Sequence, residues 1–161
     1  MSDPRVELQA EVDVPRQALY GLVATSEGLA SWLDEVEFRP EVGAPVRFRM
    51  RDAQAEGEVV AVDPPQHVSW SLDWTEEPIG TLSVVAFDLI DHGRRTHITV
   101  RQVGFRTRAQ RDLHEELWRY WLARLLEAAR RVVGAEVTAA GASTAAGAST
   151  GDPPTGAGSL P

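Results

Sequence analysis

The chain opens with a strict alternation of apolar and polar residues. Between residues 5 and 14, apolar side chains occupy every second position and charged or amide side chains occupy the others. This period of two predicts a strand with one buried face. Pro15 then suits the first turn of a helix, where its missing N–H costs nothing. The apolar positions of that helix, which is predicted to reach about Ala24, are Leu19, Leu22 and Val23.

A second short helix is predicted directly after the first. Ser26 is a residue type that caps helix N-termini. The apolar positions behind this cap are Leu29, Trp32 and Leu33. Glu35 and Glu37 follow, and we expect them in a solvated loop.

The alternation returns at residues 46–51, where apolar residues alternate with arginines. A hairpin closed by residues 52–55 would pair Phe48 with Val59 and Arg49 with Glu58. The arginines are therefore expected on a solvated, ion-paired face rather than in an anion site.

Residues 56–74 form the most informative segment, which is predicted as strand, turn and strand. Pro64 and Pro65 mark the turn, because proline lacks the N–H that a central strand needs. After the turn, Trp70 and Trp74 face one way together with Val68 and Leu72, and polar residues face the other way. A face this rich in tryptophan either packs on a large helix or lines a ligand cavity.

Two further strands are predicted over residues 81–90 and 95–104. Pairing them across the turn between them sets Ser83 beside Gln102. This polar pair is an exception on an otherwise apolar inward face, and buried polar groups need partners.

The last predicted helix runs from about Arg108 to Val133. Thr107 and Gln110 have the spacing of a capping box at its start. Its apolar stripe is wide enough to cover a sheet, and Gly134 suits its exit.

The composition changes beyond this helix. Residues 135–161 consist mostly of Ala, Gly, Ser, Thr and Pro, with one six-residue repeat. Such a segment has almost nothing to bury, so we expect a disordered tail. The predicted domain is therefore residues 1–134.

The order of these elements is that of an α+β helix-grip fold. In this fold a curved antiparallel sheet wraps around a long C-terminal helix, and two short helices follow the first strand. Four motifs agree with it. They are V-D-V-P at 12–15 followed by S-E-G-L-A-S-W-L at 26–33, G-E-V-V-A-V-D-P-P at 57–65, R-T-H-I-T-V with G-F at 95–100 and 104–105, and the last helix with His114, Trp118, Leu122 and Leu125. On these residues, within about 5–133, the chain resembles the activator of heat-shock-protein-90 ATPase homologue-like family of the SRPBCC (START-like, birch-pollen-allergen-like) superfamily.

The resemblance implies a mainly apolar cavity between the sheet and the last helix, with a few polar anchors. Leu117 replaces a family glycine, which should narrow the space under the helix. Gln102 replaces a histidine, which removes an acid–base candidate. The residues expected to contact a ligand are Trp32, Phe48, Trp70, Ser83, Val85, Val100, Gln102, Trp118 and Trp121.

The favoured function is the binding of a small apolar or amphipathic molecule, without catalysis and without a cofactor. One alternative is a cavity-based enzyme of the polyketide cyclase or aromatase type, which would act by positioning its substrate. Another is a chaperone-related partner module. Eukaryotic activators carry an additional N-terminal domain, whereas this chain begins its first strand near residue 5, so we do not expect chaperone activation.

Composition and charge limit the classes of partner that the protein is expected to have. A net charge of −8 and a pI near 5 disfavour nucleic acid. There is no cysteine, no signal-peptide pattern and no apolar run near the ~18 residues that span a bilayer, so we expect a cytoplasmic protein without membrane insertion. All 16 basic residues are arginine, which indicates a GC-rich bacterial genome. The outward Val60 and Val62 leave a homodimer open.

The four histidines do not suggest a metal site. None has metal-ligand spacing with another, such as an i, i+4 pair on one helix. His114, in the first turns of the last helix, could cap the cavity mouth. No nucleophile elbow, P-loop or carboxylate pair is present, so no catalytic residue is predicted.

Overall fold

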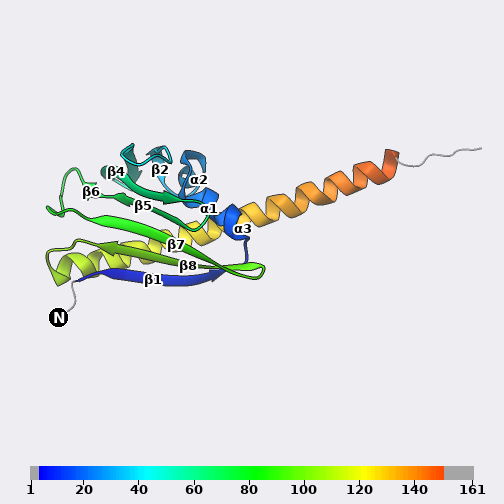
Figure 1. Cartoon of the computed structure of the whole chain (residues 1–161). Coiled ribbons are helices and arrows are strands. Elements are labelled where there is room, and N and C mark those ends of the chain that lie inside the picture. Colours follow the sequence, from blue (N-terminus) through cyan, green and yellow to red (C-terminus); the bar gives the residue numbers. More distant parts are fainter. Residues whose placement is uncertain (1–3, 151–161) are drawn as a thin grey trace, which may run out of the picture. The chain divides into compact units, whose positions relative to one another are not determined.

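The computed structural model describes the backbone of residues 4–150 and the side chains of residues 4–132. Within these residues an antiparallel sheet of eight strands has the order β1-β8-β7-β5-β4-β3-β2, with β6 paired to β4 (Figure 1). The strands are β1 (Val6–Val12), β2 (Asp34–Glu37), β3 (Pro45–Met50), β4 (Ala53–Asp63), β5 (His67–Ser71), β6 (Asp73–Trp74), β7 (Val84–His92) and β8 (Arg95–Val103). The helices are α1 (Arg16–Val23), α2 (Ser26–Ala30) and α3 (Arg108–Thr150).

The helix-grip architecture expected from the order of elements is confirmed. Along β1, β3, β7 and β8, buried apolar residues alternate with more exposed residues, as a sheet with one covered face requires. The first part of α3 covers that face, where Trp118 packs edge-on against Phe87 of β7 with ring centroids 5.8 Å apart. Aromatic packing between helix and sheet therefore forms the centre of the core.

The chain divides into a compact unit of residues 1–129 and a second unit of residues 130–161. The first contains the sheet, α1, α2 and α3 as far as Ala129. The expected end of the last helix at Val133 is wrong, because α3 continues through Gly134 to Thr150. Alanine, the strongest helix former, is frequent in this stretch and offsets its glycines. Residues 151–161, the rest of the expected disordered tail, lie outside the described residues.

Two strand registers differ from the expected ones, although the faces are as predicted. In β3–β4 the partner of Phe48 is Ala55 rather than Val59, because a two-residue turn with Arg51 at φ 57° replaces the longer loop. In β7–β8 the partner of Gln102 is Val85 rather than Ser83, because the turn is again two residues long and begins at Gly93. Both shifts are even numbers of residues, so every side chain keeps its face.

The region after α1 holds two more corrections. The N-cap of α2 is Thr25 rather than Ser26, since its hydroxyl oxygen accepts from the Gly28 N–H at 2.9 Å. Glu35 and Glu37 lie in strand β2, not in a loop. They pair with Arg49 and Arg47 at 2.6 and 3.6 Å, so these two arginines are ion-paired as expected, but the partner of Arg49 is Glu35 and not Glu58.

Gly57 marks a close approach of two strands. A Cβ built on it would lie 1.8 Å from the carbonyl oxygen of Ser71, so only glycine fits there. Nearby the chain leaves β5, and β6 pairs with a different part of β4. This break moves Trp74 away from the core and toward the helix start.

Candidate ligand pocket

The nine residues predicted to contact a ligand all lie in the interior. None is more than 4% exposed. Phe87 lies among three of the predicted tryptophans, with centroid distances of 6.2 Å to Trp32, 5.2 Å to Trp70 and 5.8 Å to Trp118. Ring-to-ring packing therefore occupies much of the space in which the ligand was expected.

The predicted polar anchors, Ser83 and Gln102, meet as expected and are satisfied by the protein. The Gln102 Nε2 donates to Ser83 Oγ at 2.7 Å, and its Oε1 accepts from Trp118 Nε1 at 2.7 Å. Both ends of the buried amide therefore have a protein partner. Trp70 differs, because its buried indole N–H has no hydrogen-bond partner among the described residues.

A pocket of about 710 Å³ lies to one side of this core, between the N-terminal half of α3 and the strands opposite. Of the nine predicted residues, its lining includes Trp121 only. The lining residues are Met50, Arg51, Asp52, Ala53, Gln54, Trp74, Glu76, Glu77, Pro78, Ile79, Gln110, Leu113, His114, Glu116, Leu117, Tyr120 and Trp121. The volume is within the usual range for small-molecule sites.

One wall of the pocket is a single stripe of α3. Leu113, Leu117, Tyr120 and Trp121 have the i, i+4, i+7, i+8 spacing that places side chains on one helix face. Leu113 is 55% exposed, so this part of the apolar wall faces solvent. Leu117, which was expected to narrow the space under the helix, is part of this wall.

The opposite wall depends on the carboxylate of Asp73 in β6. Its Oδ1 accepts from the backbone N–H groups of Trp74 at 2.8 Å and Ile79 at 2.6 Å, and its Oδ2 accepts from Gly80 at 3.3 Å. These bonds close the segment after β6 into a compact loop. Gln110 Nε2 donates to the Ile79 carbonyl at 3.2 Å, so the loop is also fastened to the start of α3.

The start of α3 is held by Thr107 and Gln110, as predicted, although the Gln110 side chain bonds the N–H of Arg106 and not that of Thr107. Thr107 Oγ1 accepts from the Gln110 N–H at 3.1 Å, and Gln110 Oε1 accepts from the Arg106 N–H at 2.9 Å. The two ends of the Gln110 side chain thus join the helix cap to the pocket loop. The cap confirms the predicted start of the helix.

His114 is the buried titratable group of the pocket. Its Nδ1 lies 2.7 Å from the Gln110 carbonyl, and its Nε2 lies 2.9 Å from Trp74 Nε1. A carbonyl only accepts and an indole N–H only donates, so Nδ1 carries the proton and Nε2 is the acceptor. Burial lowers the pKa of His114, against smaller opposing effects of the Gln110 carbonyl and Asp73. The ring is therefore neutral, with both nitrogens engaged.

The pocket rim is mainly acidic. It carries one guanidinium, Arg51, and four exposed carboxylates, which are Asp52, Glu76, Glu77 and Glu116. The Arg51 guanidinium lies 4.8 Å from the ring centre of Tyr120, a cation–π distance. The pocket thus combines aromatic walls with a negatively charged entrance.

A second hollow, of about 690 Å³, has a different character. It contains Arg16, His67, Asp88 and Arg101. His67 Nδ1 lies 2.7 Å from Asp88 Oδ1, and Arg101 lies 3.9 Å from the same carboxylate. Arg16 pairs with Asp91 at 3.3 Å, so each of these charged groups already has a partner, and the apolar pocket is the stronger candidate.

Sequence reasoning missed Trp74, His114, Ile79 and Leu113 as a group. Part of the signal was present, since Trp74 belonged to the predicted tryptophan face and His114 was considered for the cavity mouth. The missing part was the loop after β6, which follows no periodicity. Its shape depends on the Asp73 hydrogen bonds, which carry no sequence pattern of their own.

Comparison with solved structures supports the fold. Protein MLL2253 from Mesorhizobium loti is 23% identical with a TM-score of 0.72, over 79% of this chain and 97% of that chain. The Aha1 dimer from Colwellia psychrerythraea is 16% identical with a TM-score of 0.69, over 78% and 95%. DynU16, described as a putative protein in the dynemicin biosynthetic locus, is 19% identical with a TM-score of 0.69, over 78% and 47%.

A search of curated proteins found no match to the chain. In the described residues, no helix has the length and apolar character needed to cross a membrane. The sequence model of the family described as activator of Hsp90 ATPase homolog 1-like protein matches residues 13–130. The chain therefore belongs to the activator of Hsp90 ATPase homolog 1-like family.

Proposed function

We propose that this protein binds a small apolar or amphipathic molecule in the pocket between α3 and the loop after β6. The observation that carries the proposal is the aromatic lining of this pocket. Trp74 and Trp121 pack with ring centroids 5.8 Å apart and ring planes inclined by 38°, and both contribute apolar surface to the pocket wall. A ligand of planar or chain-like hydrocarbon would remove this surface from water.

The ligand site is thus proposed beside the core rather than within it. Among the residues first considered, Trp121 remains a proposed contact. Trp118 supports it from behind, since the two rings pack edge-on with centroids 5.2 Å apart. A rigid support of this kind lowers the ordering cost of binding.

The hydrogen bonds of His114 favour binding over catalysis. A general base needs a free lone pair in reach of the substrate. The Nε2 lone pair of His114 is instead occupied by the Trp74 indole N–H. We therefore propose that His114 holds Trp74 in place, and that the cyclase-type and chaperone-related alternatives are less well supported.

The proposal is tested on the full chain with a panel of fatty acids, alkylamines, flavonoids and polyketides. Tryptophan fluorescence and thermal unfolding are followed together, because a ligand that binds only the folded state raises the melting temperature. A saturable spectral change with a raised melting temperature is expected for at least one class.

Two matched variants locate the effect. Leu113→Arg places a long charged side chain on the pocket wall and is expected to abolish the response. Leu82→Arg makes the same change at an exposed leucine outside the pocket lining, 76% exposed, and should leave the response intact. No response from the wild type, or an equal response from Leu113→Arg, would overturn the proposal.

A further inference from the structure

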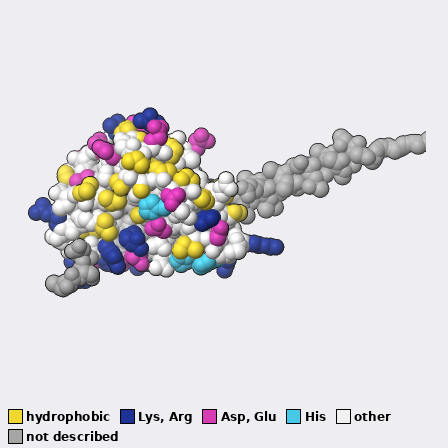
Figure 2. All heavy atoms as spheres, viewed as in Figure 1, with side chains coloured by type: hydrophobic (Ala, Val, Ile, Leu, Met, Phe, Trp, Pro, Cys, Tyr) yellow, Lys and Arg dark blue, Asp and Glu magenta, His cyan; other side chains and the backbone are white. Residues whose placement is uncertain are grey.

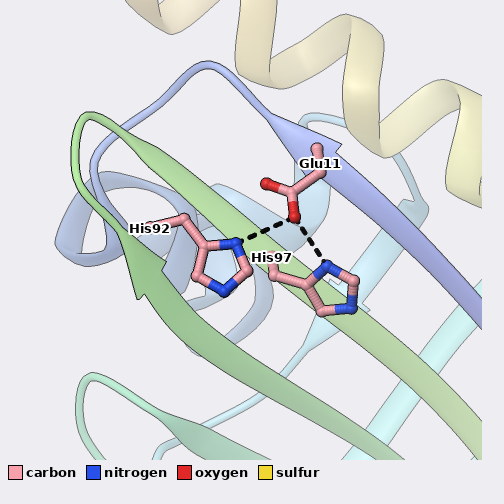
Figure 3. A group of neighbouring side chains, drawn as sticks. All are labelled: Glu11, His92 and His97. Atoms are coloured by element: carbon pink, nitrogen blue, oxygen red, sulfur yellow. Dashed lines mark hydrogen bonds and ion pairs between the residues drawn. The ribbon is translucent and has the colours of Figure 1, made fainter.

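Three side chains with metal-binding chemistry converge on the solvent face of the sheet, away from the pocket. Glu11 comes from β1, His92 from β7 and His97 from β8 (Figure 3). Each offers one ligand atom, and these atoms all lie within 4.8 Å of one another. We propose that this cluster binds a divalent transition-metal ion such as zinc.

Strand pairing brings the cluster together. Glu11 and His97 are direct partners across β1 and β8. Across β7 and β8, His92 pairs with Arg95 while His97 pairs with Ile90, so the two histidines are diagonal neighbours on one face. The sequence analysis missed this pair because it searched for histidines with i, i+4 spacing on one helix. His92 and His97 instead come together across the β7–β8 hairpin.

The distances suit a small ion. The Nδ1 atoms of His92 and His97 each lie 2.9 Å from the same oxygen, Glu11 Oε1. Zinc bonds of about 2.0–2.1 Å in a tetrahedral site separate neighbouring ligand atoms by about 3.3 Å. Small rotations of these partly exposed side chains would therefore admit the ion where hydrogen atoms now lie.

A further residue already orients one ligand. His97 Nε2 lies 3.1 Å from Gln9 Oε1, while Gln9 Nε2 donates to Glu7 Oε2 at 3.3 Å. The bond to Glu7 assigns the oxygen of the Gln9 amide to His97, so Nε2 of that ring donates to Gln9 and keeps its proton when a metal binds. The metal would take the place of the proton between Nδ1 and Glu11, as in sites where a hydrogen-bonded partner on the other ring nitrogen orients the ligand.

The donor set selects the class of metal. Two imidazoles and one carboxylate match the ligands of zinc, and imidazole also suits nickel and copper. Calcium takes six or more oxygen ligands, which this cluster does not supply. The side chains of His92 and His97 are 52% and 23% exposed, so solvent can supply the remaining ligand. Figure 2 shows that histidine side chains reach the molecular surface.

Such an ion would link β1 to the β7–β8 hairpin, because its ligands come from all three strands. β1 is an end strand of the sheet. Among the described strands β1 pairs only with β8, so a bond network from Glu11 to both histidines would fasten this edge of the sheet more firmly. Metal binding should raise the melting temperature as the zinc concentration increases.

The test is calorimetric titration of Zn²⁺ into the full chain, prepared without a polyhistidine tag, with Ca²⁺ as the comparison ion. One Zn²⁺ per chain is expected, and no heat of binding from Ca²⁺. His92→Ala, His97→Ala and Glu11→Gln should each weaken binding at least tenfold, and Gln9→Ala about tenfold. His67→Ala, which removes a surface histidine outside the cluster, should bind as the wild type does.

Two measurements on the wild type test the same site without depending on the variants being folded. Co²⁺ added to the wild type should produce the visible absorption of a tetrahedral site, and Zn²⁺ should shift the ring-proton NMR signals of His92 and His97 but not of His67. The proposal is overturned by an absence of saturable Zn²⁺ binding. Binding that survives both His92→Ala and His97→Ala, or that falls equally in His67→Ala, overturns it as well.

Discussion

The indole N–H of Trp74 donates to Nε2 of His114 across 2.9 Å, joining the sheet to the last helix at the floor of the pocket. The bond requires a neutral imidazole, because a protonated ring has no acceptor nitrogen. Trp74 also packs against Trp121, so the protonation state of His114 governs the position of a pocket wall.

This bond predicts a stability loss in acid. Burial lowers the pKa of His114 in the folded state, whereas the unfolded chain has a pKa of about 6.5. The contribution of neutral His114 to the free energy of unfolding is therefore fully present above pH 6.5. Below that pH the unfolded chain takes up a proton and the free energy of unfolding falls. The fall ends once the pH is below the pKa of the folded state. His114→Gln keeps an acceptor for Trp74 and removes the titration.

Chemical denaturation from pH 8 to pH 5 measures this effect. The difference in free energy of unfolding between wild type and His114→Gln should shrink as the pH falls. A difference that stays constant over this range would show that His114 is not held neutral by its surroundings.

The two central tryptophans should respond differently to the same substitution. Trp118 donates to the buried Gln102 Oε1, whereas the N–H of Trp70 has no partner among the described residues. Trp118→Phe leaves a buried acceptor unsatisfied, at a cost of about 1–3 kcal/mol, while Trp70→Phe removes an unsatisfied donor. Denaturation should find Trp118→Phe less stable than Trp70→Phe by this amount. Equal stabilities would mean that the Gln102 bond contributes nothing.

Leu117 should limit the size of the ligand. It lies on the pocket wall, so Leu117→Ala enlarges the pocket without changing its polarity. Ligands with an additional ring should bind this variant more tightly than the wild type, as measured by fluorescence titration. Leu126→Ala makes the same change further along α3, at a partly buried position outside the lining, and should not alter ligand preference.

The acidic rim should select for charge. Four carboxylates and one guanidinium surround the entrance, so an alkylamine should bind more tightly than a fatty acid of equal length, by about three- to tenfold at low salt. The preference should fade at 1 M salt, where the Debye length is about 3 Å. Replacing Glu76 and Glu77 by glutamine should weaken it. Tighter binding of the fatty acid would show that the rim charges do not act on the ligand.

The strands and their faces could be predicted because a period of two survives register errors of two or four residues. The inward position of Gln102 was predicted correctly although its cross-strand partner was not. The register of β3–β4 could not be predicted, since it depends on a two-residue turn in which Arg51 adopts a positive φ. Arginine rarely adopts a positive φ, so the residue type gives no indication of this turn.

The pocket was less accessible to sequence reasoning than the core. The core residues share a face through periodicity, whereas the pocket joins a helix stripe to a loop organised by the Asp73 carboxylate. The histidine cluster is similar, because Glu11 lies 81 residues from His92 in the sequence. Contacts of this kind follow from the topology of the sheet and not from local pattern.

The central claim is that a ligand binds beside Trp74 and Trp121 and not among the core tryptophans. The most direct measurement is NMR of the five indole N–H signals in the full chain, assigned by Trp→Phe variants, during titration with a ligand that raises the melting temperature. We expect saturable shifts of the Trp74 and Trp121 signals, with Trp32 and Trp70 nearly unchanged. Shifts confined to Trp32 and Trp70 would contradict it and place the ligand inside the core.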